Sequence, residues 1–133
     1  IQISYATSAG LQHALETLGQ LLEQKENQLV LRNGFIKDEP QINWRGIHMF
    51  TGPQSLALHK KMYQQVLQPL KINKVVLQCE QANWKSFPSI KNAISIGRED
   101  LKVEFDYLRS KHIEPIPLIQ SLGHMEWFFK PLK

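Results

Sequence analysis

The sequence predicts an α/β fold in which parallel strands alternate with helices. Three short apolar runs, residues 46–50, 75–79 and 113–119, follow one another at intervals of about 30 to 40 residues. A helical repeat of apolar residues separates each run from the next. This order is typical of βαβ units, whose strands pair in parallel through right-handed crossovers. Hydrophobic residues make up 42% of the 133 residues, which is enough for a core.

The N-terminal part predicts a smaller unit that precedes these repeats. Residues 8–25 carry leucines spaced by four, three and four, which indicates an amphipathic helix. Thr7 or Ser8 is placed to cap the first turn of this helix. Asn33-Gly34 favours a tight turn, so we expect a short antiparallel hairpin around these two residues. Asp38-Glu39-Pro40 then interrupts the pattern and marks a boundary.

The repeating part begins with the strand at residues 46–50. A loop over residues 51–54 leads to a helix from about Ser55, whose apolar residues are spaced four apart: Leu58, Met62, Val66 and Leu70. After the second strand, a long loop over residues 80–96 leads to another helix, with apolar residues at Leu101, Phe105 and Leu108.

Folds of this kind place their ligands at the loops that follow the carboxyl ends of the strands. Here those loops are residues 51–54, 80–87 and 120–127. We therefore expect any binding site to draw its side chains from these three segments.

Composition argues against several other classes of function. The formal charge is +4, but the basic residues are spread along the chain and Lys60-Lys61 is the one adjacent pair, so we expect no nucleic-acid partner. No apolar stretch approaches the roughly 18 residues that a membrane span needs, so we expect no membrane partner. The single cysteine, Cys79, lies in an apolar run and is interpreted as a buried thiol.

No metal or other cofactor is expected either. Three histidines fall on or near helices without the spacing of metal ligands: His13, His59 and His112.

Three segments mark the strand entries and the loop after the third strand: Trp44-Arg45-Gly46, residues 70–75, and residues 113–118 followed by Gly123-His124. In this order and spacing they resemble the barrel of family-20 glycoside hydrolases, the β-N-acetylhexosaminidases. Residues 117–126 and Glu80 are most similar to the hexosaminidase D branch.

The resemblance extends to the N-terminal part of the chain. Residues 10–21 look like the last helix of the small α/β domain that precedes the barrel in this family. The resemblance thus implies two parts, the end of a small non-catalytic α/β domain over residues 1–40 and the first β/α units of the barrel over residues 41–133. The implied fold is a partial TIM-type (β/α) barrel with about three parallel strands.

The resemblance implies that the parent protein removes terminal N-acetylhexosamine by substrate-assisted retaining hydrolysis. In the family, an adjacent Asp-Glu pair at the end of the fourth strand carries this chemistry, which departs from the usual two-carboxylate scheme. No Asp-Glu pair follows Gly123-His124 here, and Asp38-Glu39 precedes the first barrel strand. A full barrel needs ~250 residues. We therefore expect a segment of a longer enzyme that is inactive alone and contributes no catalytic residue.

The predicted substrate-binding residues are His124, Glu80, Trp84, Glu126 and Trp127. An imidazole or a carboxylate at the rim can bind sugar hydroxyls, and an indole can stack against a pyranose ring. Each prediction has a structural alternative. The histidine can bond to loop backbone, the glutamate after the second strand can be a surface acid, and either tryptophan can pack in the core.

Two residues are predicted to be structural. Arg45 precedes its strand and is expected to anchor the floor of the barrel, at the end opposite the site. Gly123 belongs to the same motif as His124. At the end of the first strand the sequence departs from the family, because residues 47–53 carry none of the charged hydroxyl ligands that the family has there.

The expected partner is a glycan that contains N-acetylhexosamine. Self-association through open sheet edges is also expected, because a partial barrel leaves strands unpaired and apolar faces uncovered. The alternatives are a non-enzymatic carbohydrate-binding or scaffold module and a generic basic α/β domain.

Overall fold

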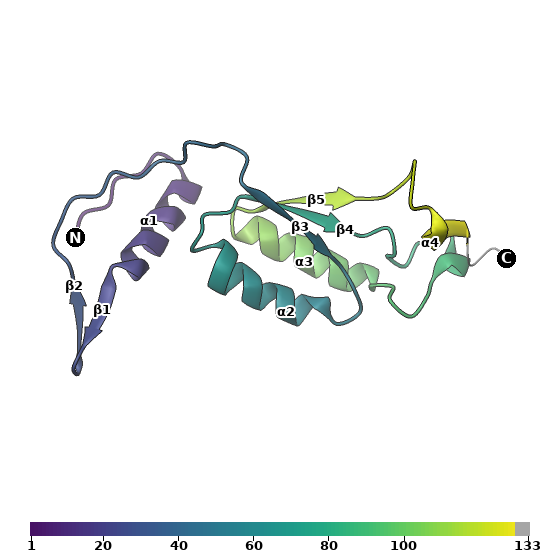
Figure 1. The fold of residues 1–133 in the computed structure, drawn as a ribbon, viewed down its shortest axis with the longest axis horizontal. Helices are drawn as coiled ribbons and strands as arrows, with labels where there is room; N and C mark the ends of the chain where they lie inside the picture. Colours follow the sequence, from purple (N-terminus) through teal and green to yellow (C-terminus); the bar gives the residue numbers. More distant parts are fainter. Residues whose placement is uncertain (130–133) are drawn as a thin grey trace.

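The computed structural model describes residues 1–129, and its elements form two groups along the chain (Figure 1). The first group comprises α1 (Ser8–Gln20), β1 (Leu22–Lys25) and β2 (Gln28–Leu31). The second group comprises β3 (Gly46–Phe50), α2 (Ser55–Met62), a π-helical turn (Tyr63–Leu67), β4 (Lys74–Gln78), a 3-10 turn (Pro88–Ile90), α3 (Arg98–Ser110), β5 (Glu114–Leu118) and α4 (Glu126–Phe129). Residues 130–133 of the predicted barrel unit lie outside the described part.

The second group is built around a parallel sheet of three strands in the order β3-β4-β5. Gly46 is paired with Lys74, and Lys74 with Glu114, so the three strands start level with one another. All three point toward the end of the molecule that carries α4 (Figure 1). The α/β fold with about three parallel strands is confirmed, and each strand lies within a residue or so of its predicted position.

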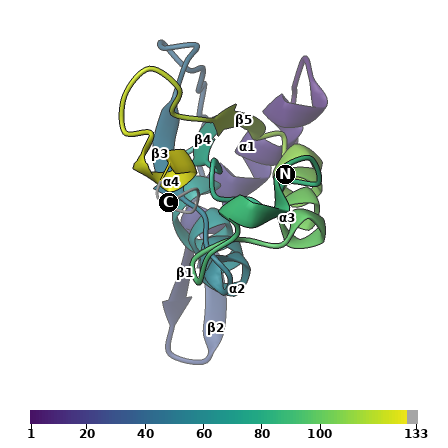
Figure 2. The same ribbon diagram turned by 90° about the vertical axis from the view of Figure 1, so that its right-hand side faces the viewer.

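The core lies between one face of this sheet and the helices α2 and α3. Met49, Val75 and Leu77 project to this face at alternate strand positions, and they pack with Leu108 and Ile113. Cys79 is also buried, as predicted, and burial raises the pKa of its thiol. The opposite face of the sheet carries no helix among the described residues (Figure 2).

The face that α2 turns to the core differs from the predicted one. The apolar residues spaced four apart along this helix predict a buried face, but Leu58 is 61% exposed and Leu70 is 64% exposed. The chain instead buries His59 on α2 and, within the π-helical turn, Tyr63 and Leu67. The burial of His59 and Tyr63 is possible because both side chains form hydrogen bonds with the carboxylate of Glu104 on α3. The periodicity of apolar residues gives no indication of this contact.

The predicted position of the N-terminal hairpin is wrong. The tight turn lies at Glu26 and Asn27, where Glu26 adopts a φ of 52°, and not at Asn33-Gly34. Gln28–Leu31 pair with Leu22–Lys25, so the helix ends at Gln20 instead of continuing to residue 25. Strand pairing over this segment overrides its local helical pattern. The predicted cap is present, since the Thr7 hydroxyl accepts a hydrogen bond from the Gly10 N–H at 3.0 Å.

The N-terminal group contacts the second group at the amino ends of the strands. Lys71 donates to the Thr17 hydroxyl on α1 at 2.7 Å and pairs with Asp38, which lowers the pKa of the Asp38 carboxyl. Gln20 donates to the Pro69 carbonyl at 2.9 Å. These contacts lie at the end of the sheet opposite α4. The division into domains at residues 40 and 41 stays a prediction.

Candidate functional site

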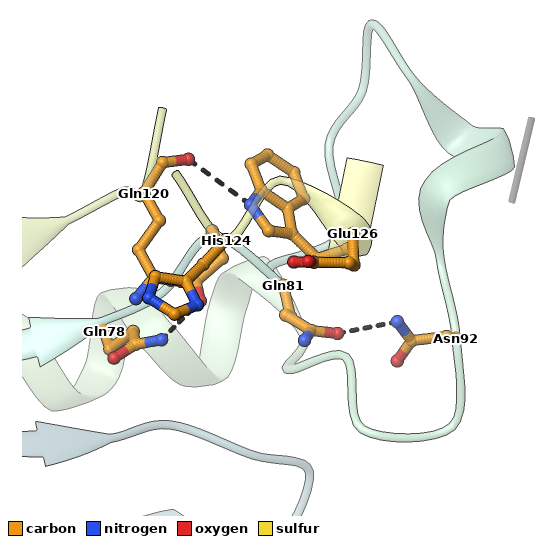
Figure 3. A pocket seen from close by; sticks show the side chains of 8 residues that line it. Gln78, Gln81, Asn92, Gln120, His124 and Glu126 are labelled. Atoms are coloured by element: carbon orange, nitrogen blue, oxygen red, sulfur yellow. Dashed lines mark hydrogen bonds between the residues drawn. The ribbon is translucent and has the colours of Figure 1, made fainter. Parts of the chain in front are cut away.

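A pocket of about 430 Å³ lies beyond the carboxyl ends of β4 and β5 (Figure 3). Its lining comes from the loops that follow these two strands and from the start of α4. The lining residues are predominantly polar: Gln78, Glu80, Gln81, Asn92, Gln120, His124, Glu126 and Trp127. Four of the five predicted substrate-binding residues are thus brought together, and they come from segments about 40 residues apart in the sequence.

Glu80 enters this pocket because β4 ends at Gln78 and the chain continues past Cys79 to the rim. The Glu80 side chain is buried, with only 3% of the residue exposed. Its Oε1 accepts a hydrogen bond from Gln78 Nε2 at 2.5 Å, whereas Oε2 has no partner among the described residues. The surface-acid alternative for Glu80 is therefore wrong. A buried carboxylate oxygen without a partner is an unsatisfied acceptor, and here it belongs to a residue that lines the pocket.

His124 also lines the pocket and comes from the loop after β5. It adopts a φ of 53°, an unusual backbone conformation for a residue with a side chain, and it is exposed. The preceding Gly123 has no positive φ, and a Cβ added there would meet nothing within 4 Å. The strain of this turn thus falls on the histidine and not on the glycine.

Trp127, from α4, lines the pocket as well. Its indole nitrogen donates to the Gln120 carbonyl at 3.3 Å, which fixes the ring relative to the loop after β5. Figure 3 shows this bond, with Gln78, Gln120 and His124 gathered on one side of the pocket and Glu126 on the other. Glu126 is exposed, so its carboxylate is available at the pocket mouth.

Sequence reasoning missed the amides of this site. Gln81 accepts a hydrogen bond from Asn92 at 2.6 Å, and both side chains line the pocket. Asn92 comes from the middle of a segment without periodicity, so no sequence signal placed it here. For Gln78 the sequence does carry a signal. It lies two residues before Glu80, and alternate residues at the end of a strand share a face.

Trp84 does not line this pocket. Its indole nitrogen donates to the Glu80 carbonyl at 2.7 Å, and the ring faces a separate groove between the long loop and α3. That groove is also lined by Phe105 and Arg98. Trp84 thus shapes the backbone that presents Glu80.

Arg45 lies at the other end of the sheet. Its Nε donates to the Lys71 carbonyl and its guanidinium also donates to the Ile42 carbonyl, both at 2.7 Å. The Arg45 backbone is held in turn by Asn73, whose side-chain oxygen accepts the Arg45 N–H at 2.9 Å. These bonds tie together the chain segments that enter β3 and β4, far from the pocket.

The chemistry of the pocket suits polyhydroxylated ligands. Carboxylates accept hydrogen bonds from hydroxyl groups, amides both accept and donate them, and the indole of Trp127 offers an apolar plane. Within residues 1–129, no group of three or more His, Cys, Asp or Glu side chains is arranged to hold a metal ion. No helix in this range is long and apolar enough to cross a membrane.

The fold is that of a partial (β/α) barrel with a polar pocket at the carboxyl ends of its strands, the place where enzymes of this architecture bind ligands. No family profile matches the sequence, and no curated protein matches it. Solved structures do match the fold, and family-20 glycoside hydrolases are among them.

One match is a β-N-acetylglucosaminidase of this family, with a TM-score of 0.79 at 21% identity over 92% of this chain and 29% of the other. The β-N-acetylhexosaminidase from Streptomyces coelicolor matches with a TM-score of 0.74 at 24% identity over 89% of this chain and 29% of the other. The chitobiase from Flavobacterium johnsoniae matches with a TM-score of 0.79 at 21% identity over 90% of this chain and 20% of the other. The chain thus spans 20–29% of the length of these structures.

Proposed function

We propose that this chain is the part of a β-N-acetylhexosaminidase-like glycoside hydrolase that helps to bind the sugar but does not carry the catalytic pair. The observation that carries the proposal is the pocket in which Glu80, His124 and Trp127 converge at the carboxyl rim of a family-20-type partial barrel. A solved structure with the same fold, the exo-β-N-acetylglucosaminidase from Vibrio harveyi, is in complex with N-acetylglucosamine. A terminal N-acetylhexosamine is the ligand we propose here.

The roles of the pocket residues follow from their chemistry. Glu80 accepts hydrogen bonds from sugar hydroxyls, and rotation about its last side-chain torsion, which is soft, can present either oxygen. His124 and Glu126 contact hydroxyls at the mouth, and Trp127 packs against the apolar face of the ring. The similarity of residues 117–126 to the hexosaminidase D branch supports this subgroup of the family.

Hydrolysis by the isolated chain is expected to be absent. Substrate-assisted cleavage in the family needs an Asp-Glu pair, and no such pair follows the third barrel strand in these 133 residues. Incubating the pure chain with the p-nitrophenyl glycoside of N-acetylglucosamine should therefore release p-nitrophenol no faster than buffer does. Turnover at an ordinary enzymatic rate, about 1 s⁻¹ or more, would disprove this assignment of roles.

The second candidate is a non-enzymatic carbohydrate-binding module, which the well-formed pocket favours. Calorimetric titration with N-acetylglucosamine and with chitobiose separates the two candidates. A segment of an enzyme retains only part of the sugar contacts and should bind in the millimolar range. Submillimolar binding by the chain alone would favour the binding module.

A further inference from the structure

The helical segments that precede β4 and β5 both end on a basic residue with a left-handed backbone. Lys71 has a φ of 56° and His112 a φ of 55°. In both cases the N–H of the following residue bonds to the carbonyl five residues back, at 2.9 Å after Lys71 and at 3.0 Å after His112. Glycine is the usual residue at this position of a helix end. Backbone strain is thus accepted to place two basic side chains at the amino ends of the strands.

The polar face of α1 is turned toward this end of the sheet (Figure 1). Thr17 accepts the hydrogen bond from Lys71 at 2.7 Å, and Gln20 donates to the Pro69 carbonyl at 2.9 Å. His13 lies one turn before Thr17, and residues four apart in a helix share a face. His13 therefore belongs to the face of α1 that meets the amino ends of the strands.

The charged groups that act on His13 come from all the segments that enter the strands. They are Arg45 before β3, Lys71 before β4, His112 before β5 and Asp38 in the connection from β2. On α1 itself the other ionisable side chain is Glu16. Burial lowers the pKa of the His13 imidazole most, and the three basic neighbours lower it further. The Asp38 carboxylate acts in the opposite sense, but it is already paired with Lys71.

We propose that the contact between α1 and the amino ends of the strands is a proton-sensitive junction between the N-terminal group and the second group. Lys71 holds the junction closed through Thr17 and Asp38, and a proton on His13 opens it by adding a positive charge among basic side chains. None of these groups lies on an edge strand's free side, so the junction does not depend on what pairs with β3 or β5. It is also independent of sugar binding, so either proposal can fail without the other.

Mild acid is expected to weaken the junction. Above the ordinary histidine pKa of about 6.5, His13 is neutral whether or not α1 is docked. Below that value the released helix takes up a proton more readily than the docked helix, so a falling pH favours release. Lys71 keeps the pKa of the Asp38 carboxyl below its ordinary value, so the Lys71–Asp38 pair stays charged in this range. His13 is therefore the group of this pair of contacts that responds to mild acid.

The distance between two spin labels measures the release directly. Gly19→Cys and Ser110→Cys place the labels on exposed positions of α1 and α3, and the remaining thiol, Cys79, is buried. A side chain added at Gly19 meets nothing within 4 Å, so the label does not disturb the docked helix. Pulsed electron paramagnetic resonance at about pH 7.5 should give one narrow distance distribution. At about pH 5.5 a second population at longer distance should appear and exceed any at the higher pH severalfold.

Substitutions of single histidines in the doubly labelled chain assign the effect of acid to His13. His13→Gln removes the titrating group and should keep the narrow distribution at both pH values. His13→Lys places a permanent charge at the same position and should release α1 already at the higher pH. His48→Gln removes a histidine in the middle of β3 and is the matched control, so it should respond to acid as the parent chain does.

Lys71→Gly tests the other half of the proposal. Glycine relieves the left-handed backbone at this helix end, so a lysine that served only to end the helix could be replaced without loosening α1. Because the Lys71 ammonium binds Thr17 and Asp38, we expect this variant to release α1 already at about pH 7.5. A single narrow distance in the parent chain at both pH values would overturn the proposal, as would an acid response of His13→Gln equal to that of the parent.

Discussion

Replacing Glu104 with alanine is expected to lower the free energy of unfolding by about 3–5 kcal/mol. Glu104 is fully buried on α3, and its Oε1 accepts the Tyr63 hydroxyl and lies 2.6 Å from His59 Nδ1. Burial and, to a smaller extent, the hydrogen bond to Glu104 raise the pKa of Tyr63. Without the carboxylate, two buried polar side chains of the α2 segment lose their acceptor at once.

Urea denaturation followed by circular dichroism measures this loss. Domains of this size are stable by about 5–15 kcal/mol, so the variant should unfold at a much lower urea concentration. Glu104→Gln keeps an acceptor and should cost less. Glu99→Ala on the exposed start of the same helix is the matched control and should change stability by less than about 1 kcal/mol. Equal effects of Glu104→Ala and Glu99→Ala would contradict the role assigned to the buried carboxylate.

Replacing Glu80 with glutamine is expected to weaken the binding of N-acetylglucosamine by roughly tenfold or more. Hydrogen bonds to a charged group are worth about 1.5–3 kcal/mol, and the substitution replaces the unpaired Oε2 acceptor with a donor. Starting from millimolar affinity, such a loss makes binding undetectable by calorimetry. The fold should survive, because glutamine has nearly the same shape and can still accept from Gln78.

Glu114→Gln provides the matched control for this variant. Glu114 lies at the amino end of β5, where it pairs with Lys74 at the opposite end of the sheet from the pocket. The same change of charge there should leave sugar binding unaltered. Equal weakening by the two variants would mean that overall charge, and not the pocket carboxylate, governs the interaction.

The order of elements could be predicted because strands and helices here have distinct periods. The runs at 46–50, 75–79 and 113–119 are short and apolar, and the helices between them repeat every three to four residues, so each element stands out locally. Parallel pairing then follows from the lengths of the connections. The convergence of Glu80 and His124 also follows, because parallel strands bring their carboxyl ends to one rim.

The predictions failed where a specific pairing or hydrogen-bond partner, which periodicity does not reveal, decides the outcome. Nothing near His59 indicates that it is buried, since the reason is a carboxylate 45 residues away on α3. The hairpin turn lies at Glu26 because Leu29–Leu31 pair with the segment before them, although Asn33-Gly34 has the stronger local turn signal. Trp84 lies outside the predicted sugar site because its indole nitrogen donates to the Glu80 carbonyl, four residues earlier in the same loop.

The central claim is that the loops after β4 and β5 form one sugar-binding pocket. Titration of the ¹⁵N-labelled chain with N-acetylglucosamine, followed by NMR, tests it most directly. The account predicts that the largest shifts fall on the backbone amides of Glu80 and Gln120 and on the indole N–H of Trp127, with β1 and β2 unaffected. Shifts that are absent from these groups at millimolar sugar, or that gather at the Arg45 end of the sheet, would contradict it.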